Sequence, residues 1–164
     1  MKTWIMFIGL ALSPFALALS DNTVLPDWYD YVKCDFCKEW GAHPGLIAHS
    51  LDESRPISDG IVWITTVEKE YRADFRRVQK AEAQVADDMG HGKSVQLCQA
   101  CKRLVDFGAA GVRIESVDGT NATVTIFTSS DTSMVRQLHE FGVTAIAEET
   151  NANAKFLASK KGMK

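Results

Sequence analysis

The residues of this chain best suited to chemistry are its four cysteines, which form two C-x-x-C pairs: Cys34 with Cys37, and Cys98 with Cys101. Two cysteines at this spacing can bind one metal ion and can also close a local disulfide, because both arrangements need Cα atoms within about 7 Å of each other. The same pairing serves thiol-disulfide exchange in oxidoreductases. The spacing therefore predicts metal or redox chemistry and leaves the choice open.

The residues that follow each pair indicate that both pairs lie at the start of a helix. Lys38-Glu39-Trp40 and Lys102-Arg103-Leu104 have the composition of first helical turns. The partial positive charge of a helix N-terminus and a neighbouring basic side chain favour the thiolate, which metal ligation and thiol exchange both require. The glycine that commonly follows the second cysteine of a zinc knuckle is absent from both pairs.

The two pairs open two segments in which the same signals follow in the same order. The first pair is followed by an Asp59-Gly60 turn, a strand-like stretch at 61–65 and a helical pattern. The second pair is followed by Asp118-Gly119, a strand-like stretch at 123–128 and another helical pattern. This order predicts a duplicated helix-strand-strand-helix unit.

We expect the two pseudo-repeats, at about 29–90 and 91–147, to form one α+β domain. Their strands can pair into one antiparallel sheet with helices on one face, an arrangement of ferredoxin-like type. Apolar residues at helical spacing predict a helix in each repeat: Val67, Tyr71, Phe75, Val78, Ala81 and Val85 in the first, and Met134, Leu138 and Phe141 in the second. The second helix is expected to end at Gly142 and to be followed by a fraying helical tail, which is basic over residues 151–164.

The first 18 residues have the order of a secretory signal peptide. Lys2 precedes the apolar run 4–12, and Ala16-Leu17-Ala18 supplies a small-residue cleavage site. We therefore expect residues 1–18 to be removed, residues 19–150 to form the domain, and the mature protein to be secreted or periplasmic, without a membrane attachment. In an oxidising compartment thiols become disulfides unless a metal ion or a reductase holds them.

Composition and missing motifs narrow the classes of function. The 164 residues include 18 basic and 21 acidic side chains, with none of the basic field that nucleic-acid binding needs. No P-loop, G-x-G-x-x-G, H-E-x-x-H or G-x-S-x-G string occurs. A binding protein is therefore favoured over a conventional enzyme. Met89 and His91 offer ligands for copper close to Cys98, although we interpret His91 as an ordinary loop residue.

Several residues of the second half match a known pattern: Cys98-Gln99-Ala100-Cys101, Gly111-Val112 at the start of a strand, Ala122-Thr123-Val124 in the next strand, and Leu138 with Phe141-Gly142-Val143-Thr144-Ala145. Residues 95–147 thereby resemble the heavy-metal-associated domain of copper chaperones and metal-transporting ATPases. The resemblance implies a ferredoxin-like fold and a soft cation such as Cu(I), with Cys98 and Cys101 as its ligands.

The pseudo-repeat suggests a different use of the same sulfurs. If the two units pack about an approximate two-fold axis, all four cysteines converge into a closed four-thiolate site suited to Zn²⁺. The sequence thus predicts an exported metal-binding protein with zinc or copper at Cys34, Cys37, Cys98 and Cys101. The alternatives are a thiol-disulfide oxidoreductase and a disulfide-stabilised binding module. Expected partners are the metal ion and a metal- or thiol-exchanging protein.

Overall fold

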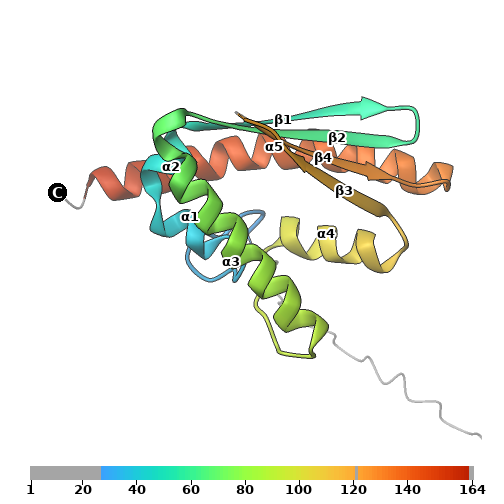
Figure 1. Cartoon of the computed structure of the whole chain (residues 1–164), viewed down its shortest axis with the longest axis horizontal. Helices are drawn as coiled ribbons and strands as arrows, with labels where there is room; N and C mark the ends of the chain where they lie inside the picture. Colours follow the sequence, from blue (N-terminus) through green and yellow to red (C-terminus); the bar gives the residue numbers. More distant parts are fainter. Residues whose placement is uncertain (1–26, 121, 163–164) are drawn as a thin grey trace, which may run out of the picture.

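A four-stranded antiparallel sheet spans the molecule, and helices lie beneath and behind it in the view of Figure 1. The computed structural model describes residues 27–120 and 122–162. The elements in chain order are α1 (Lys38–Ala42), α2 (Pro44–Ala48), β1 (Ser50–Ile57), β2 (Gly60–Val67), the 3₁₀ helix η1 (Lys69–Tyr71), α3 (Arg72–Gly90), α4 (Gln99–Ala109), β3 (Arg113–Asp118), β4 (Ala122–Thr128) and α5 (Thr132–Lys161).

The sheet has the strand order β1-β2-β4-β3, so the two hairpins join through their second strands. The register of this central pair sets Ile61 opposite Phe127 and Trp63 opposite Thr125. A side chain at Gly60 would collide with the backbone carbonyl of Phe127, so the close approach of β2 and β4 requires glycine at this position. The predicted α+β class and the antiparallel sheet are confirmed.

The main core lies between the sheet and helices α4 and α5. Phe141 of α5 is 1% exposed, and its ring meets that of Phe107 of α4 edge to face at 5.3 Å between centroids. Ile61 and Phe127 of the central strands pack into the same cluster, and Trp63 covers its border. Alternation along a strand sends neighbouring side chains to opposite faces, so this one face buries the apolar residues under both helices.

A smaller cluster holds the first half of the chain together. Leu46 of α2, Val67 at the end of β2 and Val78 of α3 are each at most 3% exposed. The ring of Trp40 of α1 packs against that of Phe75 of α3, with the centroids 5.7 Å apart and the ring planes inclined at 59°. Helix α3 is therefore positioned mainly by α1 and α2, and it ends at Gly90 as expected.

One feature of the chain differs from the sequence prediction. Helix α5 does not end at Gly142 but continues without a break to Lys161, so the basic residues that were expected to form a fraying helical tail belong to the same helix. Gly142 is buried where α5 crosses β1, and a Cβ there would collide with the hydroxyl of Ser54. The absence of a side chain at Gly142 therefore permits close packing of α5 on the sheet, and the prediction that the helix ends there is wrong. The predicted signal peptide, residues 1–18, lies outside the described residues.

None of the helices in the described part of the chain has the length and apolar character needed to cross a membrane.

Candidate metal centre

The structure brings the four predicted ligands together. The Sγ atoms of Cys34, Cys37, Cys98 and Cys101 all lie within 4.8 Å of one another; we call them the cysteine cluster. The Cys37 sulfur lies 3.7 Å from that of Cys98 and 3.6 Å from that of Cys101. A tetrahedral site with metal–sulfur bonds of about 2.3 Å separates its sulfurs by about 3.8 Å. The predicted convergence of the two pairs is confirmed, and its spacing fits one metal ion.

Each pair sits at the start of a helix, as the flanking residues predict. Cys37 is the residue immediately before α1, and Cys98 is the residue immediately before α4. Cys101 therefore lies in the first turn of α4, where its side chain projects back toward Cys98. Hydrogen bonding to Cys101 above all, and to the backbone of Cys98 to a smaller extent, lowers the pKa of Cys34, so the second pair contributes directly to the polar environment of the first.

Hydrogen bonds between the two cysteine-bearing segments hold the cluster in register. The backbone N–H of Asp35 donates to the carbonyl of Gln96 at 2.8 Å, and the Asp35 carboxylate accepts from the Gln96 N–H at 2.7 Å. The backbone N–H of Ala100 donates to the carbonyl of Trp28 at 3.1 Å. These contacts hold the first cysteine pair against the second.

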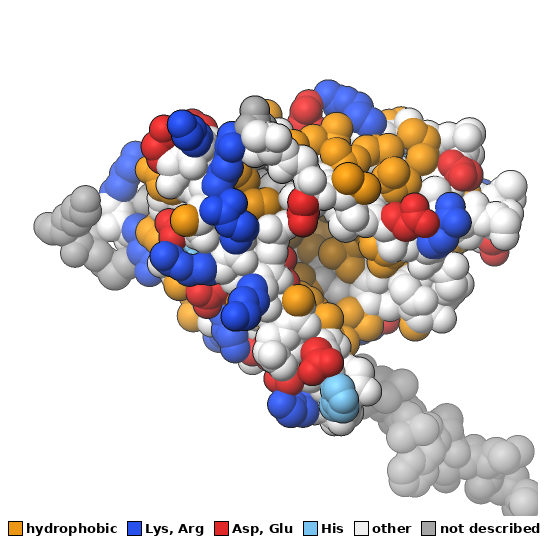
Figure 2. All heavy atoms as spheres, viewed as in Figure 1, with side chains coloured by type: hydrophobic (Ala, Val, Ile, Leu, Met, Phe, Trp, Pro, Cys, Tyr) orange, Lys and Arg blue, Asp and Glu red, His pale blue; other side chains and the backbone are white. Residues whose placement is uncertain are grey.

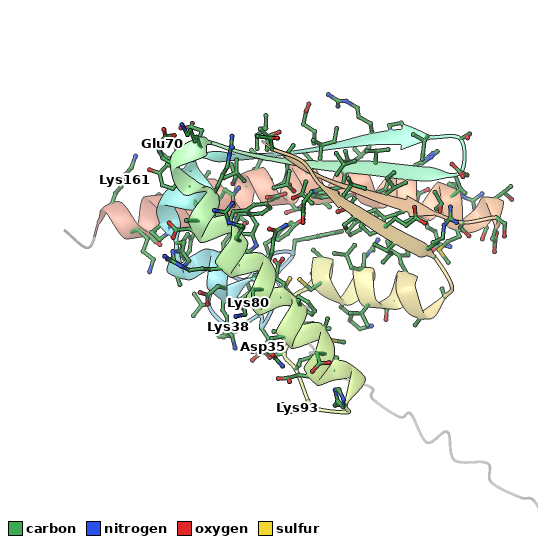
Figure 3. All side chains as sticks on the ribbon, viewed as in Figure 1. Asp35, Lys38, Glu70, Lys80, Lys93 and Lys161 are labelled. Carbon is green, nitrogen blue, oxygen red and sulfur yellow. The ribbon has the colours of Figure 1, made fainter. Side chains whose placement is uncertain are left out.

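The two lysines that follow the pairs are already engaged. Lys38 donates to Asp35 at 2.7 Å, and the labelled side chains of both residues lie together beside α1 in Figure 3. Lys102 forms an ion pair with Asp106 at 2.8 Å. Much of the positive charge that the sequence offered to the thiolates is therefore shared with carboxylates. A bound cation is the stronger way to stabilise four thiolates at this place.

The cysteine cluster is buried and its sulfurs share their protons. Cys34 and Cys98 are each 1% exposed and Cys37 is 6% exposed, whereas Cys101 is partly exposed. The hydrogen bond with Cys101 lowers the pKa of Cys98 to about 7. The hydrogen bond with Cys101, then Cys34, raises the pKa of Cys37. Sulfurs this close cannot all ionise on their own, and a divalent ion would replace the protons that remain.

All four thiols are free in this structure. The 3.6 Å between the sulfurs of Cys37 and Cys101 is far longer than a disulfide bond of about 2.05 Å. The described residues before α1, 27–37, are called the N-terminal segment, and its aromatic residues enclose one side of the cluster. Those that pack against the cluster are Trp28, Tyr29, Tyr31 and Phe36. Arg103 of α4 covers the Trp28 ring at 5.2 Å from its centroid. This packing shields the sulfurs from water, which strengthens the electrostatic attraction of a cation to them.

The other sequence candidates lie apart from the cysteine cluster. His91 follows α3, is exposed, and its Nδ1 lies 2.8 Å from the carbonyl of Asp87. Among the described residues the four cysteines are the one group of histidine, cysteine or carboxylate side chains placed to hold a metal ion. The interpretation of His91 as a loop residue therefore agrees with its position.

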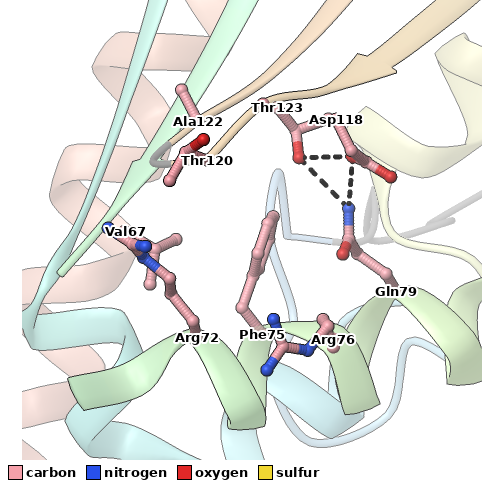
Figure 4. A pocket seen from close by; sticks show the side chains of 10 residues that line it. Val67, Arg72, Phe75, Arg76, Gln79, Asp118, Thr120, Ala122 and Thr123 are labelled. Carbon is pink, nitrogen blue, oxygen red and sulfur yellow. Dashed lines mark hydrogen bonds between the residues drawn. The ribbon is translucent and has the colours of Figure 1, made fainter. Parts of the chain in front are cut away.

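A pocket of about 130 Å³ lies between α3 and the turn from β3 to β4 (Figure 4). Arg72, Phe75 and Arg76 line its α3 side. The amide of Gln79 donates to Asp118 at 3.3 Å and to Thr123 at 3.2 Å, as the dashed lines in Figure 4 mark. These bonds attach α3 to the second hairpin, a contact that sequence reasoning did not anticipate because the three residues lie in different elements.

No protein-family model, curated protein or solved structure matches the chain. The geometry of the cysteine cluster is therefore the basis on which a function can be assigned.

Proposed function

We propose that this is an exported metal-binding protein in which the four cysteines hold one zinc ion. The observation that carries the proposal is the convergence of four cysteine sulfurs within 4.8 Å, on three buried residues and the partly exposed Cys101. Zinc favours tetrahedral sites, and sites with four thiolates are closed to further ligands. Such a site contributes folding energy and leaves no open position for catalysis. The zinc ion would join the N-terminal segment to α4.

Metal stoichiometry tests this proposal. Native mass spectrometry with elemental analysis should find about one zinc ion per chain, and Cys98→Ser should lower zinc affinity by more than about a hundredfold. His91→Ala is the matched control, because His91 is a metal-binding residue type outside the cluster, and it should keep full stoichiometry. Two ions per chain, or a Cys98→Ser variant with unchanged affinity, would contradict a shared site.

Copper is the second metal to consider, and the resemblance of residues 95–147 to heavy-metal-associated domains supports it. Cu(I) is a soft ion that thiolates select. If copper is the native metal at Cys98 and Cys101 alone, Cys34→Ser should leave that site intact. Competition with a Cu(I) chelator would then remove the metal without unfolding the chain. The resemblance stays a prediction that this competition examines.

A thiol-disulfide oxidoreductase is the second candidate function. Its support is the partly exposed Cys101 together with the pKa of Cys98, which the hydrogen bond with Cys101 lowers to about 7. A low-pKa cysteine with a partner one helical turn away is the arrangement that thiol exchange uses. Insulin-reduction activity that disappears in Cys98→Ser and is inhibited by zinc would favour this function over the zinc site.

We also propose that the two halves derive from a duplicated unit of ferredoxin-like type. In support, each half has a C-x-x-C pair, a helix, a hairpin and a long helix in the same order, and α2 is the insertion of the first half. Placing β1 after α5 would give the order strand–helix–helix–strand–strand–helix–strand, which is that of ferredoxin-like folds with one additional helix between the first two strands. A stable, folded variant circularly permuted to begin at Gly60 would support this relationship.

Export is proposed from the sequence of residues 1–18. The intact mass of the protein purified from its native host should lack these residues. A soluble cytosolic product that keeps residues 1–18 would contradict export and would weaken the disulfide alternative, since cytosolic thiols stay reduced.

A further inference from the structure

The sheet has a second face, on which the described residues place no helix. It carries the side chains that alternate with the buried core residues, and we call it the outer face. Leu51 of β1 and Val117 of β3 are 61% and 63% exposed on it. Figure 2 shows hydrophobic side chains gathered over the strands. A contiguous apolar area of this kind on a water-soluble surface indicates an interaction site.

The strand register arranges the outer face in two central rows. From β1 to β3 the residues are Glu53, Ile64, Val124 and Val117 in one row, and Arg55, Val62, Ile126 and Glu115 in the next. The two middle strands therefore contribute only branched aliphatic side chains. Charges occur only on the edge strands. An apolar centre with a charged rim is the anatomy of a protein interface.

The edges of the sheet are less available to a partner than its face. Pro56 lies within β1 and removes a hydrogen-bond donor from that edge. Charged residues occupy both edge strands, with Glu53 and Arg55 on β1 and Arg113 and Glu115 on β3. Such residues discourage the addition of another strand. A partner is therefore expected to pack on the outer face.

The charges on the rim fit a second copy of the same chain. A two-fold axis parallel to the strands, between β2 and β4, lays β1 of one copy across from β3 of the other. Arg55 then lies opposite Glu115 of the second copy, because the two residues belong to the same row. Arg55 already pairs with Glu53 at 2.6 Å, and its guanidinium has further donors for the second carboxylate.

The same axis also matches the apolar centre to itself. Strand β2 lies across from β4 of the second copy, so Val62 meets Ile126 and Ile64 meets Val124. Two sheets packed face to face with their strands nearly aligned form a stable sandwich. We propose that the protein forms a symmetric homodimer through the outer faces of its two sheets, independently of what the cysteines bind.

Sedimentation equilibrium on the mature, metal-loaded chain tests the dimer. The wild type should be dimeric at micromolar concentration, and Val117→Glu should be monomeric because it sets a second carboxylate against Glu53 of the other copy. Val143→Glu is the matched control, since Val143 is 76% exposed on α5, away from the outer face, and should stay dimeric. Circular dichroism and metal content should be unchanged in both variants. A monomeric wild type, or a dimeric Val117→Glu, would overturn the proposal.

A charge exchange tests the orientation of the two copies. Arg55→Glu and Glu115→Arg should each weaken the dimer by roughly tenfold, because each sets like charges against one another. The double variant should regain most of the lost affinity. If both single variants weaken the dimer and the double variant does not recover, Arg55 does not lie opposite Glu115 of the second copy.

Discussion

The two buried centres of this molecule are built from different materials. The core around Phe141 joins two strands and two helices through aromatic and aliphatic packing. The cysteine cluster joins two irregular segments, each of which leads into a helix, α1 or α4. Its centre consists of sulfur atoms. Trp28 contacts both, since it packs against the main core and against the cluster. The first centre is stable because apolar surface leaves water, whereas the proposed zinc ion would stabilise the second by neutralising its thiolates.

This difference predicts that the two regions respond asymmetrically to change. Removal of the metal should loosen the N-terminal segment and the start of α4 while the sheet stays folded. Mutations in the main core should lower the stability of the whole domain, including the cysteine cluster. Four predictions follow the comparison from its largest expected effect to its smallest.

The largest effect is expected from Cys37→Ser. Cys37 is the sulfur with close contacts to both Cys98 and Cys101, so its loss leaves three thiolates around the ion. Metal affinity should fall by more than about a hundredfold. Hydrogen exchange should accelerate at residues 28–37 and 94–101 and stay slow in β2 and β4. Equal acceleration throughout the sheet would show that the two regions are one cooperative unit.

Phe141→Ala should destabilise the domain by about 3–5 kcal/mol, because it leaves a cavity beside the rings of Phe107 and Trp63, both of which contact Phe141. Urea unfolding of the metal-loaded protein measures the loss. Val143→Ala, two residues further along α5 and exposed, should change stability by less than about 0.5 kcal/mol. A small effect of Phe141→Ala would mean that the metal centre, and not the apolar core, dominates stability.

Asp35→Ala should have a smaller and local effect. The carboxylate accepts a hydrogen bond from the Gln96 N–H and one from Lys38, so its loss should cost about 1–3 kcal/mol. Asp35→Asn keeps an acceptor and should recover part of the loss, whereas Lys38→Ala removes only an exposed ion pair and should have the smallest effect of the three. Metal affinity should follow this same ranking. Identical effects of the three variants would show that the Asp35–Gln96 contact does not stabilise the cysteine cluster.

The smallest effect concerns pH. Burial, and then the charge of Asp52, raises the pKa of Glu149 to about 10, far above the usual value near 4.3. The folded protein therefore binds a proton there that the unfolded chain releases, and the free energy of unfolding should fall as pH rises from about 4.5 to about 10. Glu149→Gln removes this dependence and should be more stable than the wild type at pH 8, by an amount that grows as the pH rises toward about 10. Denaturant unfolding between pH 7 and 9.5 measures it; an unchanged slope in Glu149→Gln would contradict the assignment.

The sequence predicted the elements that have strong periodic signals and did not predict those whose role depends on contacts. The residues after each cysteine pair predicted two helix starts, and the pseudo-repeat, not the cysteine spacing alone, predicted that the sulfurs converge. Strand β1 carries Glu53, Arg55 and Pro56 and lacks an apolar alternation, so it has no strand signal of its own. It forms because it is an edge strand that pairs with β2 along its whole length.

Gly142 shows the same limit for a single residue. From the sequence alone a glycine after an apolar helical stripe indicates a helix end. In the structure the glycine permits contact between α5 and Ser54 of β1, about 90 residues earlier in the chain. The Asp35–Gln96 hydrogen bonds, which align the two cysteine pairs, are equally non-local. Contacts of this kind leave no periodic pattern, so local sequence cannot predict them.

The most direct measurement of the central claim is X-ray absorption at the zinc edge on the mature protein as purified. The account predicts four sulfur neighbours at about 2.3 Å and no nitrogen or oxygen neighbour in the first coordination sphere. The same spectrum of His91→Ala should be identical. Two sulfur neighbours with nitrogen or oxygen ligands, or a zinc-free protein whose four sulfurs are all in disulfides, would contradict a shared four-thiolate site.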